Sequence, residues 1–220
     1  MTDAPKSFFL SPEIHRYLIE HGTRPDAVQT ALIEETASLG GISMMQISPE
    51  QGAFMTMLTR LVGARNAVEV GTFTGYSALC IARGLPADGH LLCCDVSEEW
   101  TSVGRRHWEE AGVGDRIDLR IAPAIETLRA LPREENIDLA FVDADKPSYA
   151  GYYEELLVRL RPNGVILVDN VLWGGNVIED DPKDENRVAI RAFNDMVAAD
   201  DRVDTVMLPL GDGLTLLRKR

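Results

Sequence analysis

The sequence predicts a protein of the α/β class with a doubly wound, seven-stranded and mostly parallel sheet. From residue 66 onward, short apolar runs alternate with helical stretches, which is typical of parallel strands joined by helices. The last two runs, 203–210 and 214–220, are separated by three residues, and so short a connection demands an antiparallel hairpin. Before residue 65 the chain reads as helices alone. We therefore predict one domain, in which residues 1–64 are helices that cover a site and residues 65–220 form the core.

Three helices are predicted in the first part of the chain. A serine followed by a proline opens the stretch 11–22, and two glycines close the stretch 24–41. The third stretch, 48–64, begins with Ser48, a proline and Gln51, which together have the spacing of a capping box. Apolar residues at helical spacing predict its buried face, which consists of Phe54, Met55, Leu58, Leu61 and Val62.

The rest of the chain predicts five strands that each lead into a helix or a loop before the final hairpin. The predicted strands are 66–70, 90–95, 117–122, 137–144 and 164–170. The predicted helices are one that starts near Gly75 and those at 98–112, 124–131, 149–162 and 186–199. In the helix 149–162 a shared apolar face is expected from Tyr149, Tyr153, Leu156, Leu157 and Leu160.

Composition narrows the class of partner. The formal net charge is -13 and the isoelectric point is about 4.7, which disfavours nucleic acid and anionic membranes because both require clustered Lys and Arg. No apolar run approaches the ~20 residues that span a bilayer, and the first residues do not resemble a signal peptide. The three cysteines, without a C-x-x-C spacing, are typical of reduced thiols. We therefore expect a cytoplasmic protein with neither a membrane nor a nucleic acid as its partner.

A glycine-containing turn follows the first predicted strand, in the segment EVGTFTGYS. Its glycines, Gly71 and Gly75, match neither the G-x-G-x-x-G dinucleotide fingerprint nor a P-loop, so phosphate binding is poorly supported. Asp95 ends the next strand, 24 residues after Gly71, where an acid can accept from ribose hydroxyls or simply be solvated. Together they favour an adenosine ligand without a phosphate signature, S-adenosylmethionine, with NAD as the competitor. Glu69 would suit the cationic end of such a ligand.

Two further buried strands end in polar side chains. FVDADK places Asp143 and Lys146 after one strand, and LVDN places Asp169 and Asn170 after the next. If the two strands are neighbours, two carboxylates and one amide oxygen meet at one edge of the sheet. That oxygen set fits Mg²⁺ best, with Ca²⁺ or Mn²⁺ as alternatives, rather than Zn²⁺. Lys146 is then either a general base or a member of a local ion pair.

The segments VEVGTFTGYSAL, FVDADKPSY and LVDNVLWGG closely resemble the cation-dependent O-methyltransferases, the class I caffeoyl-CoA and catechol O-methyltransferase-like family in its bacterial branch. The resemblance runs from about residue 40 to the C-terminal segment and implies a Rossmann-like fold. It implies that Lys146 is the catalytic base, that the metal is held by Asp143, Asp169 and Asn170, and that the enzyme is a homodimer. The cofactor contacts that it implies are Ile47, Glu69, Gly71, Thr72, Ser77, Asp95, Ala124, Asp143 and Asp145.

Three positions leave details open. Gly174 stands where the plant enzymes have an acceptor-contacting Asn, so a plant-type acceptor is not implied. Trp173 either covers the methyl acceptor or has only a structural packing role. Trp100 either flanks the adenine of the cofactor or packs on its own helix.

The sequence thus predicts transfer of a methyl group from S-adenosylmethionine to a hydroxyl of a catechol-like aromatic small molecule, with a divalent metal. The alternatives are an NAD-dependent oxidoreductase, which the irregular glycine spacing disfavours, and a non-catalytic nucleotide-binding module, which the acid cluster and Lys146 disfavour. A nucleic-acid methyltransferase is disfavoured by the acidic charge balance.

Overall fold

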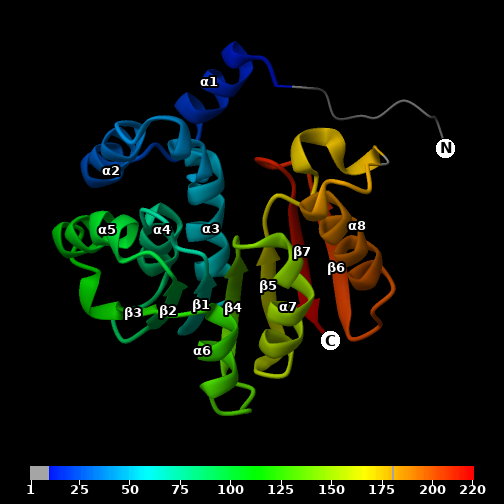
Figure 1. The fold of residues 1–220 in the computed structure, drawn as a ribbon. Coiled ribbons are helices and arrows are strands. Elements are labelled where there is room, and N and C mark those ends of the chain that lie inside the picture. Colours follow the sequence, from blue (N-terminus) through cyan, green and yellow to red (C-terminus); the bar gives the residue numbers. More distant parts are fainter. Residues whose placement is uncertain (1–9, 180) are drawn as a thin grey trace.

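A computed structural model describes residues 10–179 and 181–220, and its sheet confirms the predicted fold class (Figure 1). The sheet has seven strands in the order β3-β2-β1-β4-β5-β7-β6. Only β7 runs antiparallel to its neighbours, β5 and β6. The strands are β1 (Asn66–Val70), β2 (His90–Asp95), β3 (Ile117–Ile121), β4 (Ile137–Val142), β5 (Leu160–Val168), β6 (Val203–Leu208) and β7 (Leu214–Lys219).

Helices cover both faces of this sheet. The helices are α1 (Pro12–His21), α2 (Ala27–Ala37), α3 (Pro49–Leu61), α4 (Tyr76–Gly84), α5 (Glu98–Glu110), α6 (Ala124–Ala130), α7 (Tyr149–Leu157) and α8 (Glu185–Ala198). Four short 3₁₀ turns complete the set: η1 (Gly40–Met45), η2 (Gly114–Arg116), η3 (Lys146–Ser148) and η4 (Trp173–Ile178). One core joins α2 to α5 with one face of the sheet, and a second core joins α6 to α8 with the other face (Figure 1). No helix of the described residues is both long and apolar enough to cross a membrane.

The start of α3 differs from the prediction. The Ser48 side chain caps no backbone group, and Gln51 does not close a capping box. Instead, the Gln51 side chain is 2 % exposed and its Nε2 donates to Asp169 Oδ2 over 2.8 Å. Of the predicted buried face, Met55 is fully buried and Phe54, Leu58 and Val62 pack against the core. Leu61 is 76 % exposed, because the fully buried side of the helix is that of Gln51, Gly52, Met55 and Thr59. The chain does contain a capping box, at the start of α2, where Asp26 and Gln29 exchange bonds.

The helix predicted over 149–162 is also shorter than expected. It ends at Leu157, and Leu160 already belongs to β5, where it pairs with Ile137 of β4. Arg159 lies between them and is 1 % exposed, with its guanidinium donating to the carbonyl oxygens of Leu131 and Glu155. These bonds and the strand pairing end the helix before the predicted Pro162.

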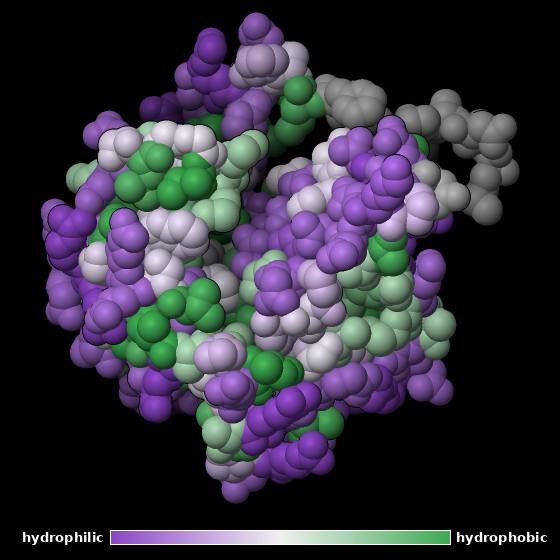
Figure 2. Space-filling view, viewed as in Figure 1, coloured by the Kyte–Doolittle hydropathy of each residue, from purple (hydrophilic) through white to green (hydrophobic). Residues whose placement is uncertain are grey.

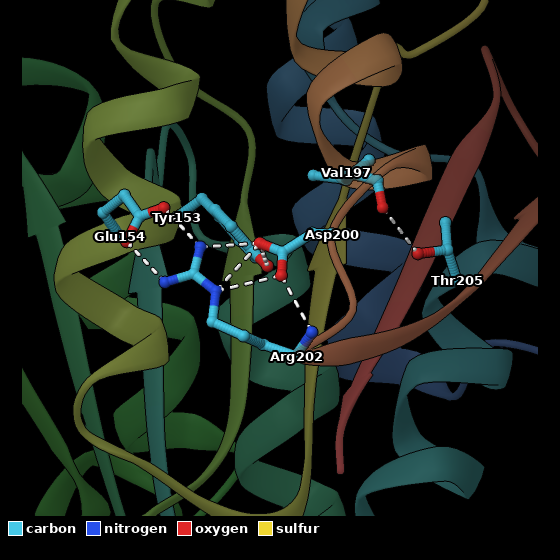
Figure 3. Close-up of polar contacts among 6 residues, drawn as sticks. All are labelled: Tyr153, Glu154, Val197, Asp200, Arg202 and Thr205. Carbon is cyan, nitrogen blue, oxygen red and sulfur yellow. Dashed lines mark hydrogen bonds and ion pairs between the residues drawn. The ribbon is translucent and has the colours of Figure 1, made fainter.

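A cluster of polar contacts joins α7 to the turn between α8 and β6 (Figure 3). The Arg202 guanidinium donates to both carboxylate oxygens of Glu154, at 3.0 and 2.6 Å, and to Asp200. The Tyr153 hydroxyl donates to Asp200 Oδ2 over 2.8 Å. This cluster, which we call the Arg202 clasp, therefore holds the middle of α7, the helix that begins beside Lys146.

Candidate active site

The carboxyl ends of the parallel strands meet at one edge of the sheet, where Figure 2 shows a hollow lined by hydrophilic residues. Strands β4 and β5 are neighbours, and Val142 pairs with Val168. The Asp169 amide continues this pairing by donating to the Val142 carbonyl of β4, and the Asp143 amide donates to the Val70 carbonyl of β1. The predicted adjacency of the two acidic strand ends is therefore confirmed.

Lys146 lies at the centre of this edge and is 8 % exposed. Its ammonium nitrogen, Nζ, lies 3.1 Å from Asp143 Oδ1, 2.7 Å from Asn170 Oδ1 and 2.7 Å from the Tyr149 hydroxyl oxygen. An ammonium has three protons to donate, so these three acceptors use all of them. The Tyr149 hydroxyl donates its own proton to the Asp169 carbonyl over 3.0 Å. Lys146 is thus held by three directed bonds within the predicted site.

Asp169 has a different environment from Asp143. It is 2 % exposed, and its carboxylate accepts from Gln51 and from the Asn170 backbone amide, both over 2.8 Å. Burial, and next the negative charge of Asp143, raise the pKa of Asp169 to about 7.

Asn170 adopts a left-handed backbone conformation, with φ of 56°, at the end of the strand. The amide oxygen that Asn170 directs to Lys146 is therefore supplied by a conformation that Asn tolerates better than most residues.

The donor set fits a hard divalent cation. Oxygens of Asp143 and Asn170 already converge on one positive charge, the Lys146 ammonium. The nearby Asp169 carboxylate has a raised pKa because it is buried and lies close to the negative charge of Asp143, and a cation bound between them would offset both effects. Two carboxylates and an amide oxygen, with no sulfur or imidazole among them, are the ligand type of Mg²⁺, Ca²⁺ or Mn²⁺.

The glycine turn packs directly on this cluster. Gly71 has φ of +87°, and a Cβ built on it would lie 1.9 Å from the Asp143 carbonyl oxygen, so only glycine fits. The Asp95 carboxylate accepts from the backbone amides of Thr72 and Phe73, both over 2.8 Å, and from the Ser97 amide. Asp95 thus holds the turn in place, a role that its sequence position did not reveal. Each carboxylate oxygen has two lone pairs, so these bonds leave acceptor capacity for a ligand.

Glu69 is fully buried beside the turn. Burial raises its pKa to about 8, and its Oε1 has no hydrogen-bond partner among the described residues. A buried carboxyl with an unused oxygen fits a ligand that brings a positive charge, because that charge would favour the ionised form.

The other predicted cofactor residues lie mostly at the same edge. Thr72 and Ser77 follow β1, Ala124 opens the helix after β3, and Asp145 follows β4 and accepts from the Tyr152 hydroxyl over 2.6 Å. Ile47 comes from outside the core, just before α3, and is 8 % exposed. The structure therefore brings residues from separate loops to one edge.

Two residues of the site have roles that sequence reasoning missed. Tyr149 was expected only as part of an apolar helix face, and Gln51 only as a cap. The signal for Tyr149 was its position three residues after Lys146, one turn along the chain. The structure also shows the contacts of the two tryptophans whose roles the sequence did not decide. The Trp173 indole nitrogen donates to the Asp184 carboxylate over 3.0 Å. Trp100 packs edge-on against Phe73, with ring centres 5.3 Å apart.

Comparison with known proteins identifies the class. The family model described as O-methyltransferase matches residues 20–220. Caffeoyl-CoA O-methyltransferase 2 of Zea mays is 37 % identical over 97 % of this chain and 85 % of its own length. The chain therefore belongs to the O-methyltransferase family. That finding supports the methyltransferase prediction over the oxidoreductase and the non-catalytic module.

Solved structures agree with the fold. A crystal structure described as a putative O-methyltransferase from Klebsiella pneumoniae has 32 % identity and a TM-score of 0.86, covering 94 % of this chain and 96 % of that one. The O-methyltransferase TomG from Streptomyces achromogenes, solved in complex with SAM, has 28 % identity and a TM-score of 0.85, with the same coverage.

Proposed function

We propose that this protein transfers a methyl group from S-adenosylmethionine to a hydroxyl of a catechol-like aromatic small molecule, with a divalent cation. The observation that carries the proposal is the convergence of Asp143, Asn170 and Lys146 at the carboxyl edge of the sheet. It combines an oxygen set for a cation with a nitrogen base, which an acceptor with two neighbouring hydroxyls requires. Support for the cofactor comes from TomG, which was solved in complex with SAM.

The residues around the glycine turn would bind the cofactor. Glu69 and Asp145 would neutralise or orient its amino acid end, and Asp95 would accept from a ribose hydroxyl with the Oδ1 lone pair that the backbone amides leave free. Gly71 allows the turn to approach the Asp143 backbone, so cofactor and metal residues lie side by side. This closeness would hold the two reactants in the relative orientation that accelerates the reaction.

Asp143, Asp169 and Asn170 would hold the cation. When bound, it would act as a Lewis acid and favour ionisation of the acceptor hydroxyl. The neutral amine form of Lys146, which has a free lone pair, would take the proton from that hydroxyl. Tyr149 would keep the lysine nitrogen aimed at the hollow, because its hydroxyl oxygen is committed to Lys146 and its proton to the Asp169 carbonyl.

An assay with a simple catechol tests this function. We expect methyl transfer that stops on chelation with EDTA and returns with Mg²⁺. We also expect Lys146→Ala to lower turnover strongly while the affinity for S-adenosylmethionine, measured by calorimetry, stays nearly constant. Turnover that ignores the chelator, or a fully active Lys146→Ala variant, would refute the metal mechanism or the assignment of the base.

We further propose a homodimer in the cytoplasm. Helix α1 has no buried residue and exposes Ile14, Tyr17 and Leu18 on one side. A second copy covering this side would remove apolar surface from water. Sedimentation of the full chain as a monomer at micromolar concentration would contradict it.

A further inference from the structure

A second hollow lies on the other side of α3 from the catalytic edge. It has a volume of about 530 Å³ and is lined by four arginines and one aspartate, namely Arg24, Arg60, Arg83, Arg116 and Asp26. The whole chain has 22 basic and 35 acidic residues, so this excess of positive charge runs against the overall composition. We call this hollow the arginine cavity.

The arginine cavity is distinct from the catalytic edge. Helix α3 lines it with Pro49, Ala53, Thr56, Met57 and Arg60. These positions share one side of a helix with 3.6 residues per turn, and Gln51 lies on the opposite side. It is Gln51 that bonds Asp169 of the proposed metal set. A ligand in the arginine cavity would therefore not occupy the methyl-transfer site.

The arginines retain capacity for an anion. Arg60 donates to the Arg83 carbonyl over 3.2 Å, and Arg116 donates to the carbonyls of Ala82 and Leu85 over 3.0 and 3.2 Å. These contacts gather the guanidinium groups at the C-terminal end of α4, but they use few of the five N–H donors of each. Within residues 10–179 and 181–220, only Arg83 of the four has a carboxylate partner, Asp26 at 2.5 Å.

Tyr76 adds a polar group to the wall of the arginine cavity. The residue is 2 % exposed, and its hydroxyl has no hydrogen-bond partner among the described residues. Its ring packs closely over Gly52, where an added Cβ would lie 2.8 Å from a ring carbon. Burial raises the pKa of Tyr76, so the hydroxyl stays protonated and is a donor for an anion.

We propose that the arginine cavity is a second ligand site, for a small phosphorylated organic molecule. Arginine binds phosphate through paired N–H donors, and two such groups, those of Arg60 and Arg116, bond the same helix end here. The wall also includes apolar side chains such as Met57 and Val113, which would contact the carbon part of the ligand. The volume lies within the range of small-molecule sites.

Calorimetric titration of the full chain with sodium pyrophosphate in EDTA buffer tests this site, because EDTA removes the heat of metal chelation. We expect one pyrophosphate per chain.

The double variant Arg24→Gln, Arg60→Gln should bind pyrophosphate about tenfold more weakly, because it removes two of the guanidinium groups that line the cavity. These two arginines are chosen because both side chains donate only to backbone carbonyls, so their loss leaves no carboxylate unpaired. Tyr76→Phe, which removes only the hydroxyl, should also weaken binding. Arg129→Gln is the matched control, since Arg129 lies on α6 outside the cavity and should leave binding unchanged.

Three results would overturn the site: no binding by the unmodified chain, equal binding by the double variant, or equal loss in the control. A fourth result, no pyrophosphate binding together with a changed oligomeric state in the double variant, would show that the arginine cavity is a protein interface and not a ligand site. Titration with S-adenosylmethionine keeps the tests separate. The double variant should bind this cofactor as the unmodified chain does, so failure of the arginine cavity leaves the proposed function standing, and the reverse also holds.

Discussion

Tyr149 is the residue on which the geometry of Lys146 most depends. Its hydroxyl is buried, accepts from the lysine nitrogen and donates to the Asp169 carbonyl, so one oxygen links the base to the strand end that carries a proposed metal residue. The other two acceptors of Lys146 are themselves proposed metal ligands. Tyr149 is therefore the partner that would stay with Lys146 when a cation binds Asp143 and Asn170.

Replacing Tyr149 with Phe should reveal this positioning role. The change removes an acceptor from Lys146 and a donor from the Asp169 carbonyl, and each unsatisfied buried group costs about 1–3 kcal/mol of stability. We expect kcat for a catechol to fall about tenfold, while KM for S-adenosylmethionine and the calorimetric affinity for it change little. Tyr153→Phe, in the same helix, is the control for lost stability alone. If both variants lose kcat equally, Tyr149 does not position the base.

Glu69 should make the stability of the metal-free protein depend on pH. Burial raises its pKa from 4.5 to about 8, so between these values the folded state holds a proton that the unfolded state has lost. Stability contributed in this way is present below the unfolded pKa and is lost as pH rises through the folded pKa. Urea unfolding at pH 5.5 and pH 8 should show a loss on the order of 3 kcal/mol, and Glu69→Gln should reduce that loss.

Asp169 contributes to the same loss, since its pKa is also raised, to about 7. Glu69→Gln should therefore flatten the pH dependence without abolishing it. Glu126→Gln, an exposed position on α6, is the matched control and should keep the full slope. A Glu69→Gln variant with an unchanged slope would contradict the burial of an ionisable group at this position.

Much of the site could be predicted at this scale, but the bonds between its residues could not. Parallel strands end at one edge, so the apolar runs before Asp143 and Asp169 were enough to predict that these acids meet. The bond from Gln51 to Asp169 spans 118 positions in the chain, and no local pattern records it. A local pattern even suggested a competing role, the capping box, which lost because the buried Asp169 carboxylate is the stronger acceptor for the Gln51 amide.

At the scale of elements, the Arg202 clasp fixes the middle of α7 against the turn before β6 (Figure 3). Asp200 accepts from both Arg202 and Tyr153, and the guanidinium beside it holds the pKa of Asp200 well below its usual range. Arg202 in turn reaches Glu154 on α7. The clasp therefore joins elements that are nearly 50 positions apart in the chain.

Replacing Arg202 with Gln should destabilise the fold by about 1–2 kcal/mol, because Asp200 loses its charged partner while the Arg202–Glu154 contact is half exposed and contributes less. Urea unfolding at pH 7 measures this. The control is Arg129→Gln, which breaks the ion pair with Glu155 from an exposed position and should cost about 0.5 kcal/mol or less. Equal losses in the two variants would show that the clasp is no more than another surface ion pair.

Element boundaries were predicted less well than element types, for a physical reason. Helix α7 ends at Leu157 because Arg159 bonds carbonyls from two segments and Leu160 pairs with Ile137. These are contacts between distant parts of the chain, which override the local apolar spacing. Likewise, Leu61 fits the helical pattern of α3 yet is exposed, because tertiary packing selected a face that includes Gln51 and Gly52.

At the scale of the whole molecule, the sheet topology explains why the site exists. The order β3-β2-β1-β4-β5 places β1 between β2 and β4, so the glycine turn after β1 lies between Asp95 and Asp143. The antiparallel β7 lies beside β5 and brings the β6–β7 turn to the same edge, where the Val171 and Leu172 amides donate to the carbonyls of Gly213 and Asp212. Charge is therefore concentrated at one edge, at a cost in repulsion that a bound cation would relieve.

Cation binding should consequently stabilise the entire fold. Asp143 and Asp169 raise the free energy of the metal-free state by mutual repulsion. A ligand that binds only the folded state raises the unfolding temperature, and above its Kd the added stability grows with the logarithm of its concentration. We expect millimolar Mg²⁺ to raise the unfolding temperature of the EDTA-treated protein by several degrees. Asp169→Asn should remove this rise. Asp145→Asn should keep it, because Asp145 bonds Tyr152 and is assigned to the cofactor. A rise that survives in Asp169→Asn, or disappears in Asp145→Asn, would place the cation elsewhere and separate the roles of these two acids differently.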